Sequence, residues 1–209
     1  SPANSLLVYH LGSAGLPSSG YYYNSGTMAA PTWAQIISVA SGGTVKWWDI
    51  TGNAGTTSAN FIGTTDNVSL NFRVFNNKAG SIDPAGSVFL GMNAGSSNTA
   101  TTNTGIGDSS LTLNTTGVQN VAIGGYTLTR NSGNYNTASG FGSLYLNTTG
   151  TQNTANGSYS LRNNVGGSYN TASGSYALFS NTTGSNNTAS GYQALYNNTT
   201  GQQNTALGH

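Results

Sequence analysis

Cysteine is absent from the 209-residue chain, which excludes disulfide bonds and thiolate metal sites. Glutamate is absent too, since all four acidic residues are aspartates, and charged residues make up only 4% of the chain. With a net charge of +1 and no basic stripe, the chain has nothing to attract nucleic-acid phosphates or an anionic membrane surface. No apolar run approaches the roughly 18 residues of a transmembrane helix. We therefore expect neither nucleic-acid binding nor membrane insertion.

Catalytic side chains are equally scarce. A hydrolase needs paired carboxylates, or a nucleophile beside a base. The two histidines, His10 and His209, lie near opposite ends of the sequence, and the aspartates at positions 49, 66, 83 and 108 are scattered singly. Asp108 recurs in no other repeat unit, so it forms no calcium column. We expect no enzyme activity, no cofactor and no metal site.

The residues that are abundant are small and polar. Glycine contributes 30 residues, only 35% of the chain is hydrophobic, and asparagine, threonine and serine dominate the rest. A disordered chain would combine such a composition with high net charge and few aromatics, whereas here aromatics reach 10%. The composition is typical of a repeat fold held by hydrogen-bonded turns, and of an exported, durable surface. Ser1 opens directly into polar sequence, as in a chain whose leader has been removed or in a fragment.

The second part of the chain repeats every 16 or 17 residues. A degenerate unit begins near Ser87, and further units begin at Asn103, Asn120, Asn136, Asn153, Asn170, Asn187 and Asn204. The third position is alanine, except for Gly105 in the first complete unit, the fifth is glycine and the twelfth is asparagine. The ninth position holds a leucine column: Leu111, Leu128, Leu144, Leu161, Leu178 and Leu195.

This period predicts an all-β fold, a parallel β-solenoid of about seven 16–17-residue coils. The period is too short for a helix–turn–helix repeat, and stacked coils rise about 4.8 Å each. Leucine and alanine columns would fill a narrow interior, asparagine columns would bond from coil to coil, and aromatics such as Phe141 and Tyr192 would lie inside or against a neighbouring chain. The array reaches His209 in mid-unit, so we expect either more chain or another subunit there.

One segment of each coil stays ambiguous. Asn-Thr-Ala-x-Gly predicts a short strand. The next stretch fits a single helical turn in the unit with Tyr192, Leu195 and Tyr196. It fits a second strand in units that place tyrosine one position later, such as Tyr159. Both alternatives remain open.

Residues 1–86 lack the repeat and predict a small β region that caps or docks the solenoid of residues 87–209. Residues 20–26 and 32–36 predict the two sides of a hairpin, and residues 44–50 another strand. Residues 68–74 alternate between apolar and polar side chains and predict a half-buried strand. The turn-forming stretch 83–86 marks the join.

The apolar strand near the start of the chain suggests a mode of assembly. Its central residues are Leu6, Leu7, Val8 and Tyr9, with Pro2 shortly before them. Such a strand can insert into a sheet of the next subunit, which is a known way to build fibres. The alternative is that it pairs within its own domain.

Asparagine and threonine also suggest surface modification or binding. Candidate glycosylation sequons occur at Asn67, Asn114, Asn147, Asn156, Asn181, Asn186, Asn197 and Asn198. Four of them share the twelfth column, which predicts a glycan stripe unless these residues serve only as turn and ladder residues. The Thr-Thr pairs after that column, such as Thr148-Thr149, favour ice binding weakly, because adjacent strand side chains point to opposite faces.

The repeat units resemble those of known surface proteins. Asn-Thr-Ala-Ser-Gly-Tyr-Gln-Ala-Leu-Tyr at residues 187–196, and the Asn-Thr-Thr-Gly that follows, look like repeats of bacterial cell-surface and tail-fibre-like proteins. They are more distantly similar to head repeats of trimeric autotransporter adhesins, and residues 48–55 and 61–67 resemble the segment before such repeats. The resemblance covers residues 47–209, and it implies export, a β-solenoid and homo-oligomerisation without catalysis.

Three functions follow as expectations. The first is a structural subunit of an extracellular filament, which associates with itself through its N-terminal strand and solenoid ends. The second is a trimeric adhesin or phage-type tail fibre that binds a host or glycan surface through exposed aromatics such as Tyr192 and Tyr196. The third is ice or carbohydrate binding. The expected location is extracellular, at a cell surface or on a virion tail.

Overall fold

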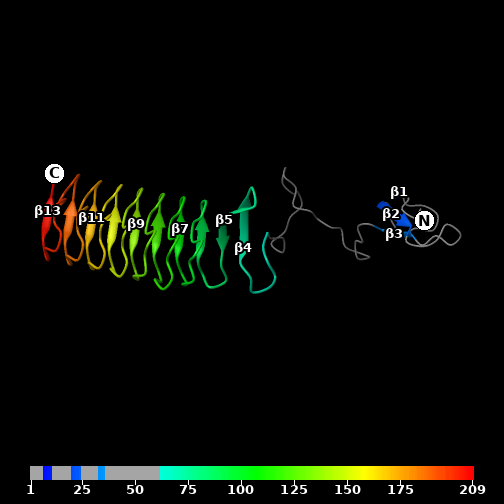
Figure 1. Cartoon of the computed structure of the whole chain (residues 1–209), viewed down its shortest axis with the longest axis horizontal. Coiled ribbons are helices and arrows are strands. Elements are labelled where there is room, and N and C mark those ends of the chain that lie inside the picture. The colour runs from blue at the N-terminus through cyan, green and yellow to red at the C-terminus, as the bar shows by residue number, and fades with distance from the viewer. Residues whose placement is uncertain (1–6, 11–19, 25–32, 36–61) are drawn as a thin grey trace. The chain divides into compact units, whose positions relative to one another are not determined.

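A computed structural model describes residues 7–10, 20–24, 33–35 and 62–209 (Figure 1). The chain divides into two units, Ser1–Ile62 and Gly63–His209. In the first, β1 (Leu7–His10), β2 (Gly20–Asn24) and β3 (Trp33–Gln35) form an antiparallel sheet in that order. The pairing of β2 with β3 confirms the predicted hairpin. Leu6 and the predicted strand at residues 44–50 lie outside the described residues.

The second unit contains one sheet of ten strands and, within residues 62–209, no helix. The strands are β4 (Leu70–Val74), β5 (Asn77–Ile82), β6 (Val88–Leu90), β7 (Thr104–Ile106), β8 (Val121–Ile123), β9 (Thr137–Ser139), β10 (Thr154–Asn156), β11 (Thr171–Ser173), β12 (Thr188–Ser190) and β13 (Thr205–Leu207). From β6 to β13 each strand pairs in parallel with the next, one coil further along the chain. Figure 1 shows these coils stacked in chain order. The predicted β-solenoid, with about seven turns of about 17 residues, is confirmed.

An antiparallel hairpin precedes the first coil. Strand β4 pairs with β5 and β5 with β6, so residues 70–82 belong to the solenoid sheet, and the sheet crosses the predicted boundary between residues 86 and 87. Phe75 and Asn76 join β4 to β5 with positive φ angles of 47° and 60°, the conformation that favours a tight hairpin. The Asp83 carboxylate accepts from the Ala85 backbone N–H at 2.7 Å and closes the predicted turn.

The prediction that residues 68–74 form a half-buried strand was wrong about burial. Strand β4 forms, but only Leu70 is half-buried and its other four residues are exposed. The reason is the position of β4 in the sheet. Strand β4 is the first strand of the ten, and alternation along a strand predicts a buried face only where another layer packs on it.

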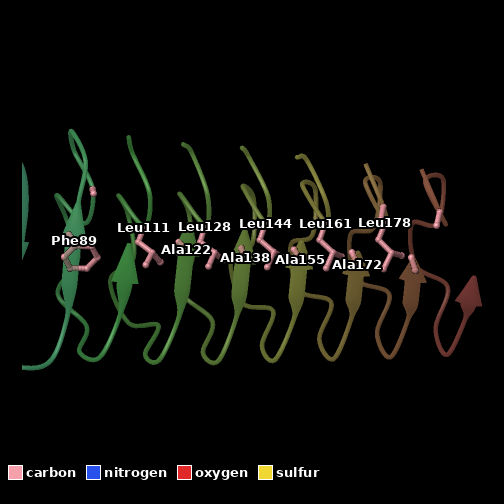
Figure 2. Close-up of a cluster of buried hydrophobic side chains, with 14 residues drawn as sticks. Phe89, Leu111, Ala122, Leu128, Ala138, Leu144, Ala155, Leu161, Ala172 and Leu178 are labelled. Carbon is pink, nitrogen blue, oxygen red and sulfur yellow. The ribbon is translucent and has the colours of Figure 1, made fainter. Parts of the chain in front are cut away.

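Leucine and alanine fill the interior as predicted. The alanines of the strands and the leucines at the ninth position of each unit face each other, and successive coils stack them into two lines (Figure 2). Leu111, Leu128, Leu144, Leu161 and Leu178 are fully buried, and Leu195 in the last complete unit is partly buried. Each buried leucine contributes about 1.5–3 kcal/mol to the free energy of folding.

Both alternatives for the stretch after the strand were wrong. It is a turn in every coil, neither a second strand nor a helical turn. The core leucines adopt left-handed φ angles, 48° at Leu144 and 52° at Leu195, and the residue two positions earlier does the same, as at Tyr159 with 59°. This backbone reverses the chain within a few residues and still aims leucine inward. The conformation costs about 1–2 kcal/mol per residue, which burial of the leucine offsets.

The first coil exchanges its large and small core residues. Phe89 stands in the alanine column, opposite Gly105, and Gly95 stands in the leucine column. A Cβ atom at Gly95 would lie 2.5 Å from the Phe89 ring, so the phenylalanine occupies the space of the missing leucine. Gly95 has a φ of 56°, close to the 49° of Leu111, so its backbone already suits leucine.

This exchange predicts a compensating pair of substitutions. Phe89→Ala alone should lower the free energy of unfolding by about 3–5 kcal/mol through a cavity, and Gly95→Leu alone should overpack the coil by about 1–3 kcal/mol. The double variant recreates the pattern of the later coils and should be more stable than either single variant. Urea denaturation measures all three, and additive losses would contradict the exchange.

Candidate functional site

The asparagines of the twelfth column form a buried hydrogen-bonded ladder, as predicted. Asn147 is typical, with no exposed surface. Its Nδ2 donates to Asn131 Oδ1 of the preceding coil at 2.6 Å and to the Gly150 carbonyl at 2.9 Å. Its Oδ1 accepts from Asn164 Nδ2 of the next coil at 2.8 Å. Each amide therefore fixes both its own turn and the spacing to its neighbours.

A second ladder runs through the asparagines that open each unit. The Asn153 backbone N–H and Nδ2 both donate to Asn136 Oδ1, at 3.0 and 3.2 Å, and Nδ2 also donates to the Gly167 carbonyl at 2.9 Å. Asn136 Nδ2 contacts Asn131 Oδ1 at 3.4 Å, which links the two ladders. A satisfied polar network of this kind specifies one register. The buried Ser110 Oγ has no hydrogen-bond partner in the described structure.

The ladder decides which sequons are accessible. Asn114, Asn147 and Asn181 are fully buried, and the Nδ2 atom that would carry a glycan donates two hydrogen bonds in each. A glycan stripe on this column is therefore incompatible with the folded coils, and the alternative of ladder residues holds. Asn198 is partly buried, with the same two hydrogen bonds. The exposed sequons are Asn67, Asn156, Asn186 and Asn197, where glycosylation stays a prediction.

Aromatic side chains form an external stripe along the turn side of the coils. The stripe comprises Tyr126, Phe141, Tyr145, Tyr159, Tyr176, Phe179, Tyr192 and Tyr196. Neighbouring ring centroids along it lie 5.0 Å apart at Phe179 and Tyr196 and 5.5 Å apart at Tyr126 and Phe141. None of these side chains is buried, so the first predicted alternative, a place inside the coil, was wrong for them, and packing against a neighbouring chain stays a prediction. From the coil of Leu111 onward the alanine column holds only small residues opposite leucine, and Phe89 of the first coil is the one buried ring among residues 62–209.

One basic side chain lies in the aromatic stripe. The Arg162 guanidinium lies 5.2 Å from the Tyr145 ring centroid and 5.9 Å from those of Tyr159 and Phe179. It flanks a depression of about 230 Å³ that is also lined by Tyr126, Phe141, Gly142, Tyr145 and Tyr159. The depression combines aromatic faces with a positive charge.

The outward face of the sheet carries a second surface, which we call the apolar face. Two cross-strand rows cover β4 to β8, one of Phe72, Leu90, Ile106 and Ile123, the other of Leu70, Ile82, Val88, Thr104 and Val121. Phe72, Ile82, Leu90, Ile106 and Ile123 are each 40–48% exposed. From β9 to β12 the same rows hold threonine, serine and asparagine, so the whole face is uncharged.

Threonine occurs in two different rows. The predicted Thr-Thr pairs lie in turns, where Thr148 Oγ1 donates to the Val165 carbonyl at 2.9 Å and Thr182 Oγ1 to the Thr199 carbonyl at 3.0 Å. The second row follows the first position of the strands, and Thr137, Thr154, Thr171, Thr188 and Thr205 all point outward there. The alternation within Thr-Ala-x signals this row, although the sequence pattern above predicts only its inward-facing alanine.

The proposed assembly strand is placed in a sheet. Leu7, Val8 and Tyr9 lie in β1 and pair with Tyr23, Tyr22 and Tyr21 of the same chain. The strand therefore pairs within its own domain in this structure, as in the alternative to strand exchange. Strand β1 is at one end of the order β1-β2-β3.

Chemical groups typical of enzymes do not gather in the described part of the chain. Within it, no three side chains of the His, Cys, Asp or Glu type lie close enough to hold a metal ion. The Asp83 carboxylate accepts from Ser69 Oγ, and that of Asp108 from Ser109 Oγ. Across the same residues, no helix has the length and apolar character needed to span a bilayer. No known protein family, curated protein or solved structure matches the chain.

Proposed function

We propose that the chain is a structural subunit of an extracellular filament or fibre and associates with further copies of itself. The observation that carries the proposal is the apolar face. Large exposed apolar surfaces on soluble proteins mark interaction sites. Here the surface is flat, uncharged and lies beside a row of hydroxyl groups, so a second copy of the same sheet complements it in shape and polarity. Two such sheets pack about 10 Å apart with interdigitated side chains.

The internal ladders support a mechanical role. Every coil adds to the preceding one through the same backbone bonds, such as Thr154 N–H to the Asn170 carbonyl at 2.8 Å, and through the same asparagine contacts. The stability of such a stack is approximately the sum of identical contributions from neighbouring coils, so each added coil is stabilised in the same way. In this proposal the solenoid ends of two copies join through backbone and side-chain hydrogen bonds of the same kind.

The N-terminal strand supplies a second mode of contact in this proposal. Strand β1 pairs on one side with β2 and is the first strand in its sheet, so exchanging it with another copy replaces only one set of pairings. Strand addition gives main-chain hydrogen bonds and a defined register. An extracellular location follows from the proposed role and from the resemblance to surface and tail-fibre-like repeats.

Electron microscopy of the purified protein tests the proposal. We expect fibrils with a regular axial repeat from the wild-type chain. The double variant Ile106→Lys, Ile123→Lys places two charges on the apolar face and should abolish lateral association, because desolvated like charges repel. The matched control Ser173→Lys, Ser190→Lys places two charges on adjacent strands of the same outward row, where the row is polar, and should assemble. Deleting residues 1–11 should shorten the fibrils if β1 is exchanged.

A trimeric adhesin or phage-type tail fibre is the second candidate. The exposed aromatic stripe favours it, because aromatic side chains are enriched in recognition surfaces. Discrete rods of fixed length and three-chain stoichiometry would contradict the filament and support this candidate.

A further inference from the structure

A gap interrupts one column of the aromatic stripe. The seventh position of the unit is tyrosine at Tyr126, Tyr159 and Tyr176, but it is Gly142 in the unit between the first two. All four residues adopt the same left-handed backbone, with φ angles of 56°, 59°, 59° and 64°. The backbone at position 142 therefore matches that of the tyrosines, but Gly142 carries no ring, is itself buried, and has the Tyr159 ring packed against it.

The depression of about 230 Å³ described above lies at this position and is lined by Gly142 together with the surrounding rings. Phe141 lies beside it, with its ring centroid 5.5 Å from those of both Tyr126 and Tyr159 in edge-to-face contact. A Cβ atom at position 142 would lie 2.9 Å from the Tyr159 ring, so any larger residue there displaces that ring and reshapes the depression that it lines. Pockets for drug-sized ligands measure about 300–1,000 Å³, so this one matches a single small ring.

Arg162 gives the depression its charge. It is the one charged side chain among the residues that line it. One guanidinium nitrogen donates to Asn163 Oδ1 at 3.1 Å. A guanidinium carries five N–H donors in a planar fork that matches a carboxylate. Donors therefore remain for a ligand, and a partly desolvated cation among aromatic rings favours an anionic one.

We propose that this depression binds a saccharide that carries a carboxylate. The negative faces of the aromatic rings attract the C–H groups of a sugar ring. Tyr126, Tyr145 and Tyr159 bring hydroxyl groups that exchange hydrogen bonds with sugar hydroxyls. Arg162 binds the carboxylate through paired, charge-assisted hydrogen bonds. This activity goes beyond the proposed structural role and does not depend on filament formation.

Titration calorimetry with two matched probes tests the ligand class. The first probe is tetragalacturonate, and the second is its methyl ester, which keeps the sugar rings and removes the charge. We expect the acid to bind at least tenfold more tightly than the ester to the wild-type chain at low salt. Arg162→Gln should remove that preference. Failure of the wild-type chain to bind the acid, or equal affinity for the two probes, would overturn the proposal.

Variants that copy residues from the other coils test the location. Gly142→Tyr introduces the residue of neighbouring coils and displaces the Tyr159 ring from the depression, and Phe141→Ser installs the serine that Ser158 and Ser175 place in the same column. Both should abolish acid binding while the melting temperature shows a folded solenoid. Tyr192→Ser makes the same kind of change in that column three coils away and should leave binding intact. Unchanged binding in Phe141→Ser, or equal loss in Tyr192→Ser, would place the site elsewhere and refute the inference. Fibril formation, scored separately, distinguishes this outcome from failure of the structural role.

Discussion

Replacing Gly157 with alanine is expected to lower the free energy of unfolding by roughly 3 kcal/mol or more. Gly157 holds a φ of 133°, which side-chain-bearing residues rarely adopt. A Cβ atom there would lie 2.6 Å from the carbonyl carbon and oxygen of Gly174 in the next coil. Backbone cannot move aside as a flexible side chain can, so the two coils must separate. Chemical denaturation followed by circular dichroism measures the loss.

Gly166 provides the matched control for this prediction. It lies in the next turn of the same coil, its φ is not in the left-handed range, and a Cβ atom would meet only Thr149 Oγ1 at 3.3 Å. Other units place Thr149 or Thr183 in this column. Gly166→Ala should therefore be neutral, or should stabilise the protein by about 0.4–1 kcal/mol because alanine lowers the conformational entropy of the unfolded chain. Equal destabilisation by the two substitutions would show that contact between coils is not the cause.

Replacing Asn147 with alanine should destabilise the chain by about 2–5 kcal/mol. The substitution removes two donated hydrogen bonds and one accepted bond, and it leaves Asn131 Oδ1, the Gly150 carbonyl and Asn164 Nδ2 with one hydrogen bond fewer. Each of the three partners keeps another hydrogen bond, so the loss comes from the three broken bonds, at about 0.5–1.5 kcal/mol each, and from the cavity left by the amide. The loss should appear as a lower midpoint in urea denaturation. Because repeat stability depends on nearest neighbours, damage in the middle of the array should weaken the coils on both sides.

The control for the asparagine ladder is Asn156. It also lies in a sequon but points outward from β10 and is exposed. Asn156→Ala should change stability by less than about 0.5 kcal/mol, the usual limit for surface substitutions. A loss in Asn147→Ala no larger than that in Asn156→Ala would mean that the buried amides add nothing to stability.

The solenoid was predictable because stacked coils of equal length repeat the same residue types at a fixed period in the sequence. Identical residues must lie above one another, so the columns of Leu128 and Ala138 could be read without coordinates. The asparagine ladders were predictable for the same reason, since a shared column places amides within hydrogen-bonding reach. The hairpin of β2 and β3 followed from local patterning and confirmed that short-range signals suffice for antiparallel neighbours.

The sequence by itself thus determined the fold class, the period and the residues of the core columns, because these depend on repetition alone. Only the tertiary structure decided which side chains point into the coil and which point to the outside. It buried the sequon at Asn147, and it exposed Phe72 because that side chain lies on the outward face of the sheet, in the same row as the exposed Leu90 and Ile106. It also set the left-handed backbone that points Leu144 into the coil and Phe141 out of it. This backbone conformation results from the packing of each coil on its neighbours and not from the propensity of a single residue. The depression at Gly142 likewise depends on the stacking of coils, which brings Tyr126, Phe141 and Tyr159 together around it.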